Sequence, residues 1–132
     1  MQENRITEIF KAKGFRATPQ RIAVYKYLCE NHTHPTVDDI YSSLSAANPS
    51  FSKTTVYNSL DALEKQGLIM SVNIDSERIH YDAVCGLHGH FICRKCKKIF
   101  DFNVDYIAFS GLDGFDISKQ DVYCSGICPE CK

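Results

Sequence analysis

Apolar residues recur three and four positions apart in four stretches of the first half of the chain. This spacing places them on one face of a helix, so each stretch predicts an amphipathic helix. The apolar sets are Ile6, Ile9 and Phe10; Ile22, Tyr25, Leu28 and Cys29; Val37, Ile40, Tyr41 and Leu44; and Val56, Leu60 and Leu63.

Capping residues bound these helices. The expected N-caps are Thr18, Thr36 and Ser52, and the expected stops after the first and fourth helices are Gly14 and Gly67. Pro19 at the first helical position strengthens the second start, and Asp39 completes a capping box with Thr36. We expect the fourth helix to run to about Gln66.

Two extended runs follow the fourth helix, at residues 68–74 and 78–82, about a polar turn at 75–77. Helices closed by a hairpin in this order are typical of a winged helix-turn-helix, whose last helix enters the major groove of DNA. The chain then changes to short strands, cysteines and glycines, which predicts a domain boundary between Asp82 and Gly86. The second part is expected to contain strands at 90–93, 98–102 and 115–123 and a short helix at 103–110. The predicted fold class is α+β.

Composition changes this picture little. The chain has 132 residues, 44% of them hydrophobic, and lacks an apolar run of bilayer length or a leader pattern. We therefore expect a globular cytoplasmic protein without a membrane partner. The net charge of -1 gives no general nucleic-acid signal. A local basic cluster does give such a signal, because no acidic residue lies between position 11 and Glu30. The basic residues of this segment are Lys11, Lys13, Arg16, Arg21 and Lys26.

Two Cys-x-x-Cys pairs are the strongest chemical signal. Four thiolates at this spacing complete a closed tetrahedral shell, so Cys93, Cys96, Cys128 and Cys131 predict a structural Zn(II) site. The alternatives are two disulfides or buried free thiols. A reducing cytosol disfavours the disulfides. Cys124 is a possible substitute ligand, whereas Cys29 and Cys85 are interpreted as small apolar core residues.

A second metal site is suggested beside the first. If residues 90–93 are a strand, His88 and His90 lie on one face and Cys93 on the other. Asp101 on the returning strand is a candidate to reach the histidine face. Asp82 ends the hairpin at the domain boundary, and His34 lies just before the third helix of the first domain. Imidazoles with carboxylates suit Mn, Fe or Zn, with Mn(II) and Fe(II) favoured by the oxygen share. The alternative is a set of ordinary surface side chains.

The DNA hypothesis depends on basic residues and on the fourth helix. Lys and Arg would neutralise phosphates, while polar and aromatic side chains at the start of the helix would meet base edges. The candidate residues are Arg16, Arg21, Lys53, Thr54, Thr55, Tyr57 and Asn58. The alternative is a solvated amphipathic helix.

Four motifs together resemble the ferric uptake regulator (Fur) family. They are GFRATPQR at 14–21, HPTVDDIY at 34–41, TTVYNSL at 54–60, and His88-Gly89-His90 with the two cysteine pairs. The resemblance implies a homodimeric, metal-dependent repressor of double-stranded operator DNA, and not an enzyme. It implies a winged-helix domain at 1–82, a hinge at 83–87 and a small α/β dimerisation and metal-binding domain at 88–132. It also implies that the four cysteines hold zinc, and that a regulatory site is formed by His34, Asp82, His88, His90 and Asp101.

Asp101 bears on the branch of the family. Iron and zinc sensors tend to carry Glu at this position, so the chain most resembles the peroxide-responsive (PerR) branch. That branch implies oxidation of a ligand histidine when Fe(II) is bound, at the positions of His34 and His88, whereas Mn(II) supports repression without this chemistry. One alternative is a sensor of iron, zinc or manganese supply. Another is a metal-dependent hydrolase, for which the sequence offers no general base or substrate pocket signature.

Overall fold

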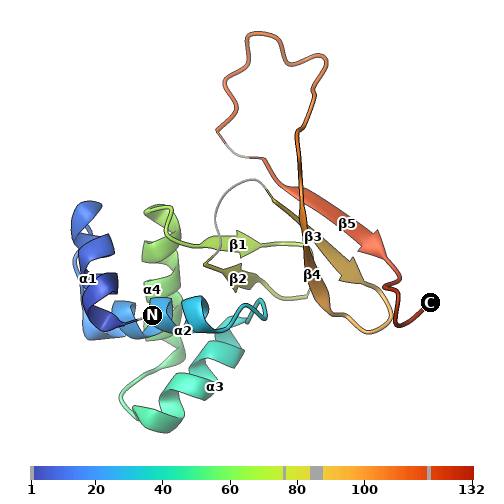
Figure 1. Ribbon diagram of the computed structural model, residues 1–132. Helices are drawn as coiled ribbons and strands as arrows, with labels where there is room; N and C mark the ends of the chain where they lie inside the picture. Colours follow the sequence, from blue (N-terminus) through green and yellow to red (C-terminus); the bar gives the residue numbers. More distant parts are fainter. Residues whose placement is uncertain (1, 76, 84–87, 119) are drawn as a thin grey trace. The chain divides into compact units, whose positions relative to one another are not determined.

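The computed structural model describes residues 2–75, 77–83, 88–118 and 120–132, and the chain divides into two compact units, Met1–Cys85 and Gly86–Lys132 (Figure 1). Most of the predicted hinge, residues 84–87, lies outside the described residues. The predicted core residue Cys85 lies there too. None of the described helices is both long and apolar enough to cross a bilayer.

The first unit contains the four predicted helices. They are α1 (Glu3–Ala12), α2 (Pro19–Glu30), α3 (Val37–Ala47) and α4 (Lys53–Lys65). Helix α2 packs against each of the other three, and α4 also packs against α3. Their apolar faces meet in one core, in which Ile6, Phe10, Val24, Ile40, Val56, Leu60 and Leu63 are completely buried. The helical periodicity therefore predicted both the elements and the core.

The helix ends follow from local hydrogen bonding. The side chains of Thr18, Thr36 and Ser52 accept the backbone N–H groups of Arg21, Asp39 and Thr55. At α3 the bond is reciprocal, because the Asp39 carboxylate accepts the Thr36 N–H at 3.0 Å. Gly14 and Gly67 have φ of 66° and 72°, the left-handed region in which glycine ends a helix at little cost. The predicted caps are confirmed.

A short antiparallel hairpin of β1 (Met70–Val72) and β2 (His80–Asp82) follows α4. It is shorter than predicted because Leu68 and Ile69 are buried among the helices instead of extending the first strand. The chain before α3 joins the hairpin, since the Tyr81 N–H donates to the Pro35 carbonyl at 2.9 Å. Helices closed by a wing are thus present in the predicted order, and the winged helix-turn-helix is confirmed.

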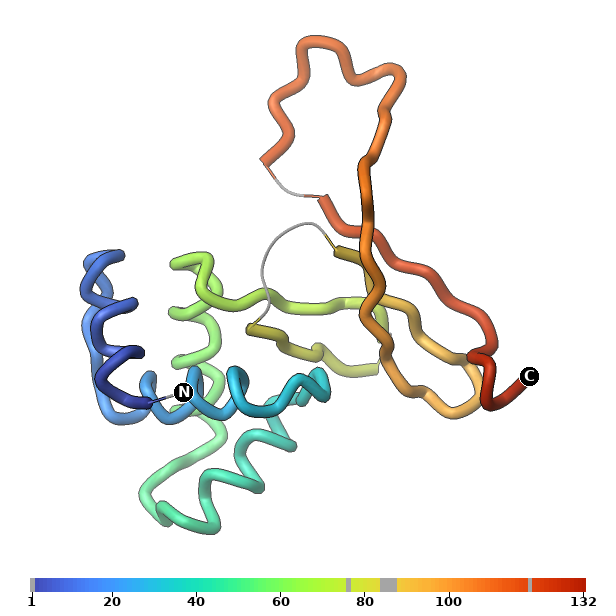
Figure 2. Tube along the Cα trace, in the orientation of Figure 1, coloured from blue at the N-terminus to red at the C-terminus, as the bar shows by residue number. Residues whose placement is uncertain are grey.

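The second unit is built on a three-stranded sheet of order β4-β3-β5, in which β3 is central. Strand β3 (His88–Cys93) runs antiparallel to β4 (Ile99–Asn103) and parallel to β5 (Val122–Gly126). The Cys-x-x-Cys knuckle joins β3 to β4. Between β4 and β5 the chain leaves the sheet, and Figure 2 shows residues 104–118 as an open loop.

Two predictions for this unit are wrong. Residues 104–109 form no helix, because Asn103 still pairs with His88 in the sheet and the side chains beyond it find no surface to pack on: Tyr106 is 81% exposed. The last strand overlaps the predicted range only at Val122 and Tyr123, because its place is set by pairing with β3. The α+β class is nevertheless confirmed.

Candidate metal centres and nucleic-acid interface

Four cysteines meet at the end of the central strand of the second unit's sheet. Cys93 ends β3, and the segment after β5 brings Cys128 and Cys131 back to it. The sulfur atoms of these residues and Cys96 all lie within 4.8 Å of one another. A tetrahedral zinc with Zn–S bonds of about 2.3 Å requires S···S separations of roughly 3.8 Å. The Cys96 and Cys128 sulfurs are 3.9 Å apart, which fits a metal and is too long for a disulfide.

Backbone N–H groups prepare one thiol of this cluster for ionisation. The Cys93 sulfur accepts the N–H groups of Cys96 and Cys128, each at 3.4 Å. These bonds lower the pKa of Cys93 to about 6, the Cys96 N–H contributing most. Hydrogen bonding to Cys128 and burial raise the pKa of Cys131 to about 12. Four crowded sulfurs cannot all ionise without a cation among them, so this donor set fits Zn(II).

The opposite face of β3 carries the two histidines. His88 and His90 are two residues apart and project on one side, with 3.1 Å between their Nε2 atoms. Asp101 is the residue of β4 directly opposite His90, and its Oδ1 lies 3.1 Å from His90 Nε2 and 3.9 Å from His88 Nε2. Asp101 therefore reaches the histidine face, as strand parity predicts. Two imidazoles and a carboxylate converge here, a donor set that fits Fe(II) or Mn(II).

Gly89 lets an aromatic ring pack against β3 on the face opposite the two histidines. It pairs with Phe102 across the sheet, and a Cβ at position 89 would collide with the Phe102 ring. The ring thus covers the backbone of β3 at the one residue without a side chain. This packing fixes the strand that carries the histidines.

The winged-helix unit holds the remaining predicted ligands. His34 Nε2 lies 3.6 Å from Asp82 Oδ2, and both side chains are buried. His32, which sequence reasoning missed, lies with Nδ1 at 3.8 Å from the other Asp82 oxygen. Its side chain is 53% exposed. The signal for His32 was its His-x-His spacing with His34.

A second missed residue is His80 of β2. Its Nδ1 lies 2.7 Å from the carbonyl oxygen of His34, and its Nε2 lies 3.0 Å from Asp75 Oδ2 in the wing turn. The bond from His80 lowers the pKa of Asp75, and the Glu77 N–H lowers it further. The sequence gave no signal for the contact between His80 and His34, because these residues are 46 positions apart in the chain.

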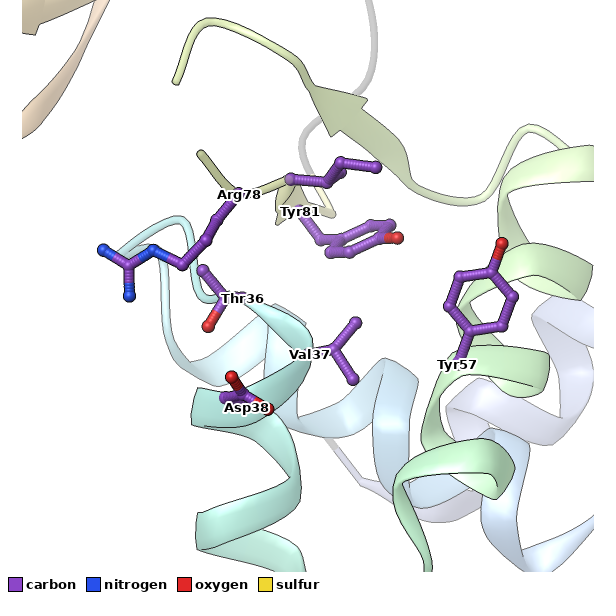
Figure 3. A pocket seen from close by; sticks show the side chains of 7 residues that line it. Thr36, Val37, Asp38, Tyr57, Arg78 and Tyr81 are labelled. Atoms are coloured by element: carbon purple, nitrogen blue, oxygen red, sulfur yellow. The ribbon is translucent and has the colours of Figure 1, made fainter. Parts of the chain in front are cut away.

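Helix α4 presents a polar face that fits a nucleic acid. Thr54, Tyr57 and Asn58 are exposed along it, while Thr55 contributes to the cap through its hydroxyl, 2.9 Å from Ser52 Oγ. Figure 3 shows Tyr57 and Tyr81 among the side chains that line a hollow of this unit. The hollow has a volume of about 200 Å³ and is also lined by Thr36, Val37, Asp38, Arg78 and Ile79. The hollow lies within the winged-helix unit, between α4, the start of α3 and β2.

The basic residues predicted to contact DNA differ in their interactions within the chain. Arg16 is exposed. The Arg21 guanidinium donates a hydrogen bond to the Arg16 carbonyl oxygen at 3.0 Å and stacks over the Phe15 ring, 4.3 Å from its centroid. Lys53 forms an ion pair with Asp38 at 2.9 Å, and its pKa is raised by that hydrogen bond. A phosphate would have to compete with Asp38 for the Lys53 ammonium.

Known proteins resemble the chain over both units. A model of the Ferric uptake regulator family matches residues 12–112. The Peroxide-responsive repressor PerR of Staphylococcus epidermidis is 37% identical, over 98% of this chain and 89% of its own. PerR from Streptococcus pyogenes, solved as a structural basis for peroxide sensing and gene regulation, is 30% identical with a TM-score of 0.56, covering 98% of this chain and 92% of its own. The Ferric uptake regulator from Francisella tularensis with iron is 26% identical with a TM-score of 0.69, covering 89% and 95%.

Proposed function

The chain belongs to the ferric uptake regulator family, and we propose that it is a metal-dependent repressor that binds operator DNA as a homodimer and senses peroxide. The observation that carries the proposal is the pairing of Asp101 with His90 on the histidine face of β3. It gives an aspartate, and not a glutamate, a place in the donor set. The relatives named as peroxide-responsive repressors support the same branch.

The four-cysteine cluster would hold Zn(II) in a closed shell with a structural role. Cys93, Cys96, Cys128 and Cys131 would supply all four ligands of a tetrahedral ion, so no position would be left for a reactant. The ion would tie the segment after β5 to the end of β3. Its binding free energy would therefore be folding free energy of this unit.

The regulatory ion, Fe(II) or Mn(II), would take ligands from both units. Neither half is complete by itself: the winged-helix unit offers His34 and Asp82, and the sheet unit offers His88, His90 and Asp101. We take the domains as 1–82 and 88–132, with a hinge at 83–87. Shared ligands would fix the hinge, and thereby the spacing of two recognition helices in a dimer.

Peroxide would act on the ligand histidines. Fe(II), when bound, supplies the reduction of peroxide that leads to oxidation of a neighbouring imidazole, which Mn(II) does not support. His34 and His88 are the candidate positions. With His34 oxidised, the winged-helix unit would contribute Asp82 alone, and the two units would no longer be held for DNA binding.

DNA contact is proposed for the exposed face of α4 and the basic residues around it. Thr54, Tyr57 and Asn58 would meet bases, with support from Thr55, and the phosphates would be neutralised by Arg16, Arg21 and Lys53. The dimer contact is proposed for the sheet unit, where residues 104–118 expose Tyr106, Phe109 and Phe115. Such a regulator would act in the cytoplasm, without enzymatic turnover.

A metal and peroxide titration tests this function. The zinc-loaded chain is given Fe(II), Mn(II) or Zn(II), and its binding to a duplex selected from a random library by the Mn(II) form is measured by fluorescence anisotropy. Peroxide should release DNA only from the Fe(II) form, with one oxygen atom added to a peptide containing His34 or His88. His34→Ala should lose metal-dependent binding and keep its zinc.

The same titration separates the alternatives. DNA binding driven by one metal and indifferent to peroxide would indicate a sensor of metal supply and would refute peroxide sensing. Turnover of a hydrolysable substrate that disappears in Asp101→Ala would favour a hydrolase. Metal-dependent binding that survives in both His34→Ala and Asp101→Ala would refute the proposed regulatory site.

A further inference from the structure

Strand β2 contacts His34 twice. His80 and Asp82 are two positions apart in this strand, so their side chains project from the same face. The Asp82 carboxylate faces the His34 imidazole at 3.6 Å, and the His80 ring contacts the His34 carbonyl oxygen at 2.7 Å. One face of the wing strand thus holds both the ring and the main chain of this histidine.

The His34 backbone is in a conformation that needs such support. Its φ is 56°, in the left-handed region that residues with a Cβ rarely adopt. The following Pro35 restricts it further, because proline disfavours helical ψ values in the residue before it. The bond from His80 to the His34 carbonyl, with that from the Tyr81 N–H to Pro35, secures this turn. The direction of the His34 ring depends on it.

His80 is fixed in its turn by the tip of the wing. The two ring nitrogens of His80 contact two different oxygens, Nδ1 the His34 carbonyl oxygen and Nε2 the Asp75 carboxylate, so the ring is held at both ends. Asp75 is held from its other oxygen, which accepts the Glu77 N–H at 2.9 Å. The side chains of His80 and Asp75 are only 11% and 16% exposed, so water competes weakly for these bonds.

We propose that Asp75 and His80 form a positioning relay, which orients His34 as a metal ligand and joins it to the wing turn. The relay rests on the proposed regulatory site at His34, and it assigns a role to two residues outside the ligand set. Ligand histidines are usually oriented by hydrogen bonds around them; here the oriented group is the main chain. Because coupling is reciprocal, metal at His34 would stabilise the wing turn, and disturbing the turn would weaken metal binding.

Two amide substitutions separate the two bonds of His80. The Asn side-chain NH2 group lies where imidazole Nδ1 lies, so His80→Asn keeps the donor to His34 and loses Asp75. The Gln NH2 group reaches the place of Nε2, so His80→Gln keeps the donor to Asp75 alone. We expect His80→Gln to weaken Mn(II) binding by about 10-fold. His80→Asn should weaken it less, by about 3-fold, because Asp75 no longer fixes the donor.

The measurements use the full-length, zinc-loaded chain. Mn(II) affinity is determined by competition with a chelating dye, and thermal unfolding of the Mn-free chain reports any loss of fold. Asp75→Ala should resemble His80→Asn. Glu77→Ala, at an exposed position in the same turn whose backbone N–H remains, is the matched control and should bind Mn(II) like the wild type. Equal affinities in the Asn and Gln variants would overturn the relay.

A metal-independent measurement separates failure of the relay from failure of the proposed function. In the Mn-free chain the Tyr81 amide, bonded to Pro35, should exchange its hydrogen several-fold faster in His80→Gln than in the wild type, and near the wild-type rate in His80→Asn. Unchanged exchange in His80→Gln refutes the relay whether or not metal binds. If His34→Ala leaves Mn(II) affinity unchanged, the regulatory site is refuted, and the exchange rates still decide the relay.

Discussion

Replacing Cys96 by serine should unfold the sheet unit and leave the winged helix folded. The apolar core formed by the described residues belongs to the first unit, where fourteen buried residues form one cluster. In the described part of the sheet unit, the buried apolar side chains are Ile92, Cys93 and Cys128, two of which are proposed zinc ligands. The metal would therefore take the place of a hydrophobic core.

The magnitude follows from this shortage of core. A unit well under about 70 residues rarely obtains more than 3–5 kcal/mol from burial alone, even with a good core. Structural zinc contributes apparent free energies of about 10–16 kcal/mol near neutral pH. Loss of one of the four thiolates removes part of this zinc-binding free energy, which burial in the sheet unit cannot replace. The β3 amides should therefore lose protection from hydrogen exchange at 25 °C. The thermal transition of the helical unit should remain.

Zinc content and hydrogen exchange are measured on the same sample, with Cys124→Ser as the control. Cys124 is an exposed cysteine of β5 outside the cluster, so its replacement should keep one zinc per chain and a protected β3. The reasoning is refuted if Cys96→Ser retains stoichiometric zinc and wild-type protection. Loss of zinc in Cys124→Ser would instead assign the fourth ligand to that residue.

Three further predictions concern single residues. Gly89→Ala should destabilise the zinc-loaded chain by about 1–3 kcal/mol in denaturant titrations, because the new Cβ meets the Phe102 ring; an unchanged midpoint would contradict that packing. Thr36→Ala should cost about 1 kcal/mol and lower the Tm of the helical unit by roughly 4–8 °C, while Thr36→Ser retains the cap bond to Asp39 and most of the stability. Asp101→Ala should abolish Mn(II)-dependent DNA binding at full zinc content, and binding at wild-type Mn(II) concentrations would show that the carboxylate is not a ligand.

The helical part of the fold could be predicted because its signals are local. Periodicity and capping act within one or two turns, so Thr18, Thr36 and Ser52 mark the helix starts without knowledge of the tertiary structure. The cysteine cluster could be predicted equally well, because two cysteines at Cys-x-x-Cys spacing can bind the same tetrahedral metal ion. Strand parity correctly placed Asp101 on the histidine face.

The failures share a different physical cause. The position of β5 is decided by pairing with β3, some thirty residues earlier in the chain, and not by the apolar residues around Phe115. The absence of a helix at 104–109 reflects the lack of a surface for its apolar side to cover. His80 and His32 acquire their neighbours only when the wing strand meets the turn before α3. The His-x-His spacing with His34 was a local signal for His32, whereas no local pattern indicated the contact between His80 and His34.

The parity of β3 also has a consequence for how this sequence can change. His90 and Cys93 are an odd number of residues apart, so they occupy opposite faces of a strand that has neighbours on both edges. Inserting or deleting one residue between them would turn either the thiols or the imidazoles to the wrong side. Neither donor set can drift in register without loss of the other. The spacing between His90 and Cys93 therefore constrains the length of β3, and we expect insertions and deletions between these two residues not to be tolerated.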